Sequence, residues 1–383
     1  MRVLILGGDG YLGWPTAMAF ARGKHDVCIV DNYLRRKLAQ QTRSEPLVEM
    51  PKLDERASIF RALSGCRVSA KLGDCTDYAF LSDLVRQFAP DTIIHYAEIP
   101  SAPYSMIGRD EARLTLENNV RGTFNVIWAI QEHAPSCHLI KLGTLGEYGT
   151  PNIEIEEGWI EVEHKGRRER FLYPRQGSSL YHTTKIMDTD LLWFYVRTCG
   201  LRVTDLMQGP VYGTSTTETD LDARLGSNFH YDDIFGTVVN RFIVQAVAGI
   251  PLTVYGLGNQ TRGFINLKDT VQCVELAAAA PPAPGEMRVL NQFTELFTIN
   301  HLAAKVKSAA ERLGLTVTIK PLPNPRQEAE EHFYKAANRG LLELGLKPTL
   351  MTEDVLVELV SAVLAHRDSI DCSKIMPRVH WRR

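Results

Sequence analysis

A glycine-rich segment near the start of the chain constrains the fold more than any other feature. Residues 3–6 form a short apolar run, Gly7, Gly10 and Gly13 follow at a spacing of three, and a helical pattern covers residues 14–22. Glycines at this spacing allow a tight turn and let the backbone approach a pyrophosphate, which the amides of the next helix can bind. The segment therefore predicts a strand–turn–helix unit that binds a dinucleotide.

Strand-like and helix-like stretches alternate through the first half of the chain. Further strands are predicted over residues 27–30, 67–72, 92–96, 137–142 and 201–206, and helices over residues 59–63, 78–87, 114–133 and 179–198. A polar, basic stretch over residues 35–56 separates the second strand from the next helix. Such alternation is typical of parallel sheets with right-handed crossovers. We expect an α/β protein with a doubly wound, Rossmann-like parallel sheet.

The second half of the chain is less regular. It carries polar insertions, a Gly/Pro-rich stretch at residues 281–285, and helical patterns over residues 301–313 and 352–365. We expect residues 1–212 to form the dinucleotide-binding domain. Residues 213–383 would form mainly a smaller C-terminal substrate lobe, interleaved with the last strands of the sheet.

Charge and cysteine usage limit the partners. The net charge is −2, which gives no bulk attraction to nucleic acid or to a membrane surface. The first apolar strand follows Met1 directly, so we expect no signal peptide, and no apolar run is long enough to span a bilayer. The seven cysteines have no metal-ligand spacing. We therefore expect a cytoplasmic protein with reduced thiols and no metal site.

An acidic residue after the second strand indicates which dinucleotide binds. Asp31 follows Gly7 by 24 residues, where a carboxylate can accept hydrogen bonds from a ribose diol and repels a 2′-phosphate. NAD is therefore favoured, although Arg35 and Arg36 keep NADP open. Asp74 and Cys75 follow the third strand, where such folds hold the adenine.

A Tyr-x-x-x-Lys pair is the main catalytic candidate. Tyr181 and Lys185 are four apart on a predicted helix and therefore share one face. An ammonium group and a nicotinamide cation would both favour the phenolate, so that Tyr181 could remove a hydroxyl proton as a hydride leaves the same carbon. Thr144 closes the fifth strand and could bond the reacting oxygen. Glu147 is either a second acid/base or a structural carboxylate.

Together these residues resemble the extended short-chain dehydrogenase/reductases and, within them, the UDP-sulfoquinovose synthase family. The resemblance covers nearly the whole chain. Its most specific parts are the segment from Thr144 through Gly146, Glu147, Tyr148 and Gly149, and the Asn324-Pro325-Arg326 segment with residues 328–332.

The resemblance implies a tightly held NAD, UDP-glucose and sulfite as substrates, and a homodimer joined through the helices at residues 114–133 and 179–198. The sugar would be oxidised at C4, lose water from C6, add sulfite at C6 and be reduced again at C4. The implied catalytic residues are Thr144, Tyr181, Lys185, Glu147 and His182, although His182 could also be an ordinary helix residue. The implied cofactor residues are Gly7, Gly8, Gly10, Tyr11, Leu12, Gly13, Asp31, Asn32, Arg35, Asp74, Cys75, Ala97, Asn119, Tyr181, Lys185 and Gln208. The implied substrate residues are Thr144, Gln208, Thr253, Tyr255, Arg262 and Arg326.

The chain departs from the family next to the expected active site. Ile99 and Pro100 stand where the family has Gln-Arg, and Leu145 replaces a methionine. A cation that could hold an anionic sulfur group is thereby lost. Another NAD-dependent nucleotide-sugar epimerase or dehydratase, without sulfite addition, is therefore an open alternative. A non-catalytic NAD-binding regulator is a third reading, which the intact Thr144, Tyr181 and Lys185 set disfavours.

Overall fold

A parallel sheet forms the centre of the protein. The computed structural model describes residues 1–326 and 334–381. Within them, seven parallel strands pair in the order β12-β8-β5-β4-β1-β2-β3. Their bounds are β1 (Arg2–Leu6), β2 (Asp26–Asp31), β3 (Val68–Leu72), β4 (Thr92–His95), β5 (His138–Thr144), β8 (Arg202–Gln208) and β12 (Met287–Gln292). This arrangement confirms the expected doubly wound α/β fold.

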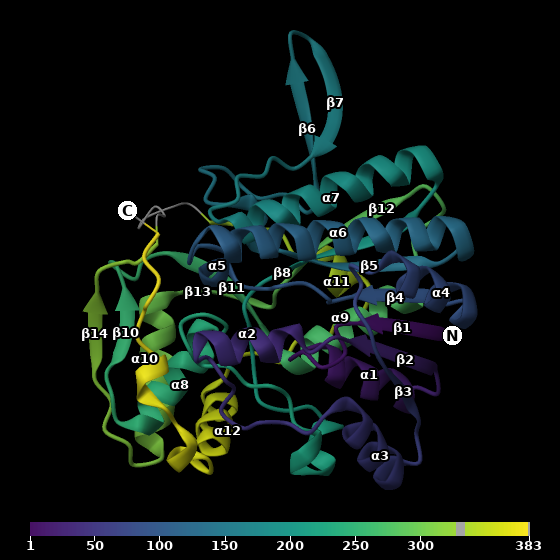
Figure 1. The fold of residues 1–383 in the computed structure, drawn as a ribbon. Coiled ribbons are helices and arrows are strands. Elements are labelled where there is room, and N and C mark those ends of the chain that lie inside the picture. The colour runs from purple at the N-terminus through teal and green to yellow at the C-terminus, as the bar shows by residue number, and fades with distance from the viewer. Residues whose placement is uncertain (327–333, 382–383) are drawn as a thin grey trace.

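Helices cover both faces of this sheet (Figure 1). One face carries α4 (Tyr78–Phe88), α6 (Arg109–His133) and α7 (Leu180–Cys199), and the other carries α1 (Gly13–Arg22), α3 (Leu53–Ser64), α9 (Leu267–Ala279) and α11 (Arg339–Glu343). Strand β1 shows why both faces need cover. Its residues Leu4 and Leu6 join one apolar cluster, while Val3 and Ile5 join the other. Alternate side chains of a strand point to opposite faces, so a wholly apolar strand must be buried on both.

A second lobe lies beyond the carboxyl ends of the strands. Its helices α8 (Val238–Ala248), α10 (Ile299–Arg312) and α12 (Glu353–Leu364) share an apolar core. Strand β10 (Leu252–Tyr255) pairs with β14 (Ile319–Leu322), and β11 (Thr261–Asn266) lies between β9 (Val211–Tyr212) and β13 (Glu295–Thr298). Because β12 returns to the main sheet between β11 and β13, the chain crosses between the lobes more than once.

Short elements complete the fold. Helices α2 (Leu34–Thr42) and α5 (Ala102–Ser105) follow β2 and β4 at the carboxyl edge of the sheet. The 3₁₀ helices are η1 (Leu145–Tyr148), η2 (Thr219–Leu221), η3 (Ala223–Leu225), η4 (Arg367–Ser369) and η5 (Cys372–Lys374). About half of the polar stretch at residues 35–56 is helical, since α2 and the start of α3 lie in it. The expectation missed α2 because it buries only Leu38 and Ala39.

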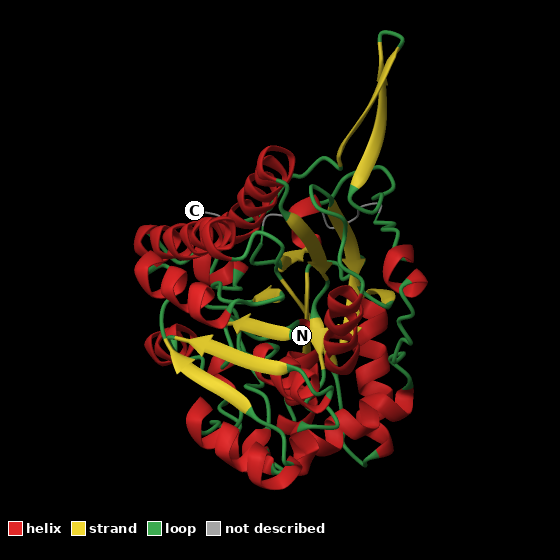
Figure 2. Ribbon diagram, turned by 90° about the vertical axis from the view of Figure 1, so that its right-hand side faces the viewer, coloured by secondary structure: helices red, strands yellow, loops and turns green. Residues whose placement is uncertain are grey.

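A long hairpin projects from the body of the protein (Figure 2). Strands β6 (Trp159–His164) and β7 (Arg167–Leu172) pair antiparallel through a turn at Lys165 and Gly166, both with positive φ. Apart from its base the hairpin is exposed, and Glu163 pairs with Arg168 across it at 2.7 Å.

Candidate active site

One cleft, with a volume of about 410 Å³, gathers most of the expected site residues. It is lined by the segments that follow β1, β2, β3, β4, β5 and β8, together with the start of α7 and segments of the second lobe. In doubly wound folds ligands bind at this carboxyl edge of the sheet. The cleft therefore lies where the sequence placed both the dinucleotide and the substrate.

The turn between β1 and α1 is shaped for close approach by a ligand. The amides of Gly7 and Gly8 donate to the carbonyl of Val30 at 2.8 and 2.9 Å, and Gly7 has a φ of +89°. A Cβ at Gly13 would lie 2.1 Å from the Gly7 carbonyl oxygen, so only glycine fits there. Helix α1 then begins without a side-chain cap, and Gly10 lines the cleft. This cradle fits a pyrophosphate on the uncapped helix N-terminus.

Asp31 ends β2 in the position expected for a ribose ligand. Its two carboxylate oxygens accept from the amides of Asp9 and Tyr33 at 2.9 and 2.7 Å. Burial, followed by repulsion from the Asp9 carboxylate, raises the pKa of Asp31 to about 6. Arg36 does not line the cleft, because its guanidinium pairs with Asp9 at 2.7 Å. Of the two arginines that kept NADP open, only Arg35 faces the cleft.

The residues expected at the adenine end also line the cleft. Asp74 and Cys75 follow β3 and line the cleft with Asn32. The Asn32 amide donates to Asp74 at 2.9 Å, and burial raises the pKa of the Cys75 thiol. Together with the glycine turn and Asp31, these residues fit NAD along the whole adenosine half of the molecule.

Tyr181, Lys185 and Thr144 come together at the other end of the dinucleotide groove. Ser179 caps α7 by accepting from the amide of His182, which fixes the first turn where Tyr181 lies. The Lys185 ammonium is 6.0 Å from the centre of the Tyr181 ring. The Thr144 hydroxyl oxygen accepts from the amide of Gly146 at 3.2 Å, so its own proton is left for a substrate oxygen.

Glu98 is the residue of this centre that the sequence reasoning did not select. Its carboxylate lies 2.6 Å from the Lys185 ammonium, with both side chains almost fully buried, and it lines the cleft. Burial is the largest cause that raises the pKa of Tyr181, and the Glu98 charge comes next. In the chain alone, Tyr181 is therefore a neutral phenol, whereas the sequence argument for a lowered pKa rested on Lys185 and the nicotinamide.

Glu147 and His182 lie behind the cleft. Glu147 is fully buried, and its carboxylate lies 3.5 Å from the Lys141 ammonium and 3.4 Å from Arg175. It also accepts from the amide of Thr144, completing a capping box on η1. The His182 imidazole packs on Gly146, and burial with nearby arginines lowers its pKa to about 3. The geometry gives both residues supporting positions around Thr144.

The second lobe supplies a basic and aromatic end to the cleft. Tyr255, Arg262 and Arg326 line it as expected, and so do Arg241 and Gln260, which the sequence reasoning missed. The Arg241 guanidinium lies 4.2 Å from the centre of the Tyr255 ring. Thr253 does not reach the cleft.

Several buried polar atoms at this end lack a hydrogen-bond partner within the described residues. They are Arg241 Nε, Tyr255 Oη and Gln260 Oε1. Buried polar groups are normally paired, so three orphans in one place indicate room for a polar ligand. Thr253 instead holds Arg241, because its carbonyl accepts from the guanidinium at 3.2 Å. An anionic, hydrogen-bonding ligand such as a nucleoside diphosphate fits this environment.

Three further expected residues are placed as follows. Gln208 lines the cleft and donates to Gln292 at 3.0 Å. Gly8 packs on Ile29 beneath the turn, and Asn119 lies behind the cleft, where its side chain accepts from the amide of Ile99 at 2.8 Å. The cleft is lined by the expected residues Gly7, Gly10, Tyr11, Leu12, Gly13, Asp31, Asn32, Arg35, Asp74, Cys75, Ala97, Thr144, Tyr181, Lys185, Gln208, Tyr255, Arg262 and Arg326. Residues 328–332, part of the resemblance, lie outside the described residues.

Ile99 and Pro100, the departure from the family, line the cleft. Ile99 is buried in an apolar cluster with Tyr104, Ile234 and Phe235. Positions 99 and 100 are therefore apolar where the resemblance implied a cation, while the Arg35 guanidinium lies 4.1 Å from the centre of the Phe235 ring in the same cluster.

Comparison with known proteins identifies the relatives. The model of the "NAD dependent epimerase/dehydratase family" matches residues 3–291. The chain is 48% identical over 382 residues to the chloroplastic UDP-sulfoquinovose synthase of Spinacia oleracea, covering 100% of this chain and 79% of the relative. It is 43% identical over 387 residues to the UDP-sulfoquinovose synthase of Sulfolobus acidocaldarius, covering 100% and 98%.

A solved structure supports the fold. UDP-glucose 4-epimerase from Bifidobacterium longum, in complex with NAD+ and UDP, superposes with a TM-score of 0.70 at 17% identity, covering 98% of this chain and 99% of the epimerase.

Among the described residues, no helix combines the length and apolar character needed to cross a bilayer. No group of three or more His, Cys, Asp or Glu residues in the described chain is arranged to hold a metal.

Proposed function

Because this chain belongs to the NAD dependent epimerase/dehydratase family, with UDP-sulfoquinovose synthases among its relatives, we propose that it converts UDP-glucose and sulfite into UDP-sulfoquinovose. The observation that carries the proposal is the convergence of Thr144, Tyr181 and Lys185 between a dinucleotide groove and a basic nucleotide end. A regulator that only binds NAD has no use for this arrangement.

Residues 1–212 would hold NAD and residues 213–383 mainly the UDP-sugar. The glycine turn receives the pyrophosphate, Asp31 the adenosine ribose, and Asn32, Asp74 and Cys75 the adenine. Arg262 and Arg326 would pair with the diphosphate of the substrate, and Tyr255 would lie beside its nucleoside. When bound, NAD supplies reversible acceptance of a hydride from sugar C4.

The proton chemistry belongs to this chain. Tyr181 takes the proton of the C4 hydroxyl while Thr144 donates a hydrogen bond to the same oxygen. The resulting C4 ketone acidifies the C5 proton, and loss of that proton with the C6 hydroxyl, as water, leaves a C5–C6 double bond. The sulfur lone pair of sulfite adds to C6, and a proton returns to C5. Reduction at C4, with the proton returned by Tyr181, closes the cycle without net redox change.

Product analysis with and without sulfite tests this proposal. We expect purified protein, incubated with UDP-glucose and sulfite, to give a sugar nucleotide in which a sulfonate replaces the C6 hydroxyl. Its mass is therefore higher than that of UDP-glucose. An isobaric or dehydrated product, unchanged by sulfite, would instead establish the second candidate, an epimerase or dehydratase. That candidate is favoured by one observation, the apolar wall made by Ile99 and Pro100 at the cleft.

A homodimer and a cytoplasmic location form part of the same proposal. Helices α6 and α7 lie side by side (Figure 1). The exposed fraction is 39% for Trp128 on α6 and 50% for Phe194 on α7. A second copy would cover these aromatic side chains.

The cytoplasmic location rests on cysteine usage, since Cys199 and Cys372 are exposed free thiols.

A further inference from the structure

The C-terminal end of the described chain runs along the cleft as a strap, defined here as residues 375–381. It follows α12, η4 and η5, and its yellow trace in Figure 1 ends on the side of the sheet where α2 and α5 lie. Pro377, Val379 and Trp381 line the cleft, whereas Met376, Arg378 and His380 are exposed. Alternate residues of an extended segment point to opposite sides. The strap thus presents one face to the ligand space.

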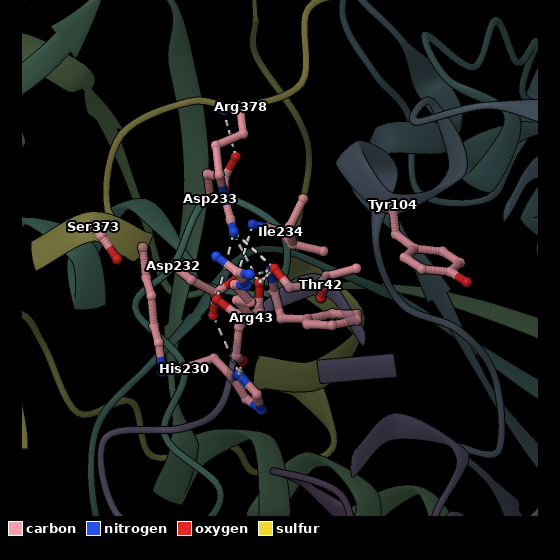
Figure 3. A network of polar contacts seen from close by, with 12 residues as sticks. Thr42, Arg43, Tyr104, His230, Asp232, Asp233, Ile234, Ser373 and Arg378 are labelled. Carbon is pink, nitrogen blue, oxygen red and sulfur yellow. Dashed lines mark hydrogen bonds and ion pairs between the residues drawn. The ribbon is translucent and has the colours of Figure 1, made fainter. Parts of the chain in front are cut away.

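A charged anchor fixes the middle of the strap (Figure 3). The Arg378 guanidinium donates to the Asp233 carboxylate at 2.9 Å, and the Arg378 amide donates to the same carboxylate at 2.7 Å. The guanidinium also donates to the Thr42 carbonyl at 2.7 Å and to the Ser44 hydroxyl at 2.9 Å. Because Asp233 itself lines the cleft, the anchor ties the strap to both the end of α2 and the wall of the site.

An apolar contact adds to this anchor. Val379 packs against the cluster of Ile99, Tyr104, Ile234 and Phe235. Segments from the sheet domain and from the second lobe meet in that cluster, so the strap rests on a junction of both lobes.

The last described residue meets the nucleotide end of the cleft. The Trp381 amide donates to the Pro325 carbonyl at 2.9 Å. The Arg326 guanidinium lies 5.4 Å from the centre of the Trp381 ring, within the range of a cation–π interaction. The arginine side chain is long and flexible, and a planar ring packed beside the guanidinium restricts its rotamers. Less conformational entropy is then lost when the guanidinium binds an anion.

We propose that the strap is part of the nucleotide-sugar site, with Trp381 positioning Arg326 for the substrate diphosphate and Arg378 anchoring Trp381 through Asp233. This inference rests on the proposed function, because it assumes that a nucleoside diphosphate occupies the basic end. The C-terminus then contributes a binding determinant, and affinity for the substrate depends on it more than affinity for NAD does.

Calorimetric titration with UDP tests the role of Trp381 without requiring turnover. For Trp381→Ala we expect UDP binding about tenfold weaker than in the unchanged protein. Trp381→Phe should lose less, because it keeps a ring, and Arg378→Met should weaken UDP binding in the same direction as Trp381→Ala. The matched control is His380→Ala, an exposed neighbour outside the cleft lining, which should bind UDP normally. NAD content should stay unchanged in all four variants, and melting temperature in the two Trp381 variants and His380→Ala; Arg378→Met leaves the buried Asp233 carboxylate unpaired and should melt at a lower temperature.

The outcomes separate this inference from the proposed function. If the unchanged protein fails to bind UDP, the proposed function itself is wrong. If it binds UDP and Trp381→Ala binds equally well, the role of Trp381 is wrong and the proposed function stands. If Trp381→Ala loses UDP affinity together with NAD and melting temperature, the strap supports the fold and the inference is contradicted. An increased KM for UDP-glucose at unchanged kcat would agree with it.

Discussion

The Lys185 ammonium lies 2.6 Å from the Glu98 carboxylate, and both groups are buried at the edge of the cleft. Glu98 thereby offsets the charge through which Lys185 would favour ionisation of Tyr181. Glu147 and Asp188 also raise the pKa of Tyr181, Lys141 lowers it, and the Arg35 charge interacts with Tyr181 as well. Burial, followed by the Glu98 charge, keeps Tyr181 a weak acid until a further positive charge enters the groove.

Replacing Glu98 by Gln should therefore move the pH dependence of turnover. Removing the negative charge lowers the pKa of Tyr181, so the phenolate forms at lower pH. We expect the acidic limb of kcat/KM to shift by about one unit toward lower pH. Asp190→Asn removes an exposed carboxylate from α7, the helix that carries Tyr181, and serves as the control. It should leave the acidic limb of kcat/KM unchanged. A profile of Glu98→Gln that coincides with that of the unchanged protein would contradict this electrostatic role.

Asp31 predicts a pH dependence of NAD binding. Its pKa in the protein without ligand is raised to about 6, and the ribose diol donates best to the ionised carboxylate. NAD affinity should therefore fall as the pH decreases through about 6. Calorimetry on NAD-free protein should show this loss, and Asp31→Asn should bind NAD weakly with no such pH dependence. Equal NAD affinity at pH values on both sides of 6 would argue against a ribose contact.

Two Gly→Ala changes, one in the glycine turn and one in helix α6, should have opposite effects. Gly13→Ala places a Cβ on the Gly7 carbonyl, so we expect loss of NAD and a destabilisation on the order of 3 kcal/mol. Gly122→Ala, inside α6, adds a Cβ that meets no atom beyond its own helical turns closer than 3.9 Å, so it should stabilise the protein by about 0.5–1 kcal/mol. Denaturant unfolding measures both. If Gly13→Ala retains NAD, the assignment of the glycine turn as the pyrophosphate site is wrong.

The aromatic side chains exposed on α6 and α7 predict how the dimer can be broken. Trp128→Glu combined with Phe194→Glu should give a monomer in sedimentation experiments, because charges cannot be buried at the interface without a partner. Leu72→Glu, at an exposed leucine on the edge strand β3, should leave the assembly unchanged. If the protein without substitutions sediments as a monomer, the proposed interface is wrong.

The sequence predicted the sheet well, and most residues expected around the dinucleotide line the cleft, because the signals of both are local. Apolar runs such as residues 3–6 need burial on both faces, and glycines next to them leave few alternatives. Helix α2 was missed since it buries only Leu38 and Ala39, and the β6–β7 hairpin since it packs on the body of the protein only at its base. These elements are stabilised by contacts that no local pattern reveals.

The site was predictable where a motif carries it. Tyr181, Lys185 and Thr144 line the cleft as expected, but Glu98, Arg241 and Trp381 belong to no motif that was recognised. Glu98 could have been inferred from the sequence, since it directly precedes Ile99 and Pro100, the departure from the family. Trp381 is brought to Arg326 only by the fold, so its position follows from tertiary structure alone.

The central claim is that Tyr181 removes the C4 proton of a UDP-sugar beside NAD. The most direct measurement compares product formation from UDP-glucose and sulfite by Tyr181→Phe and by Tyr195→Phe, a change on the same helix outside the cleft. We predict that Tyr181→Phe keeps its NAD and its UDP affinity but loses turnover by a factor on the order of 10²–10⁴, while Tyr195→Phe remains active. Undiminished turnover by Tyr181→Phe would contradict the claim.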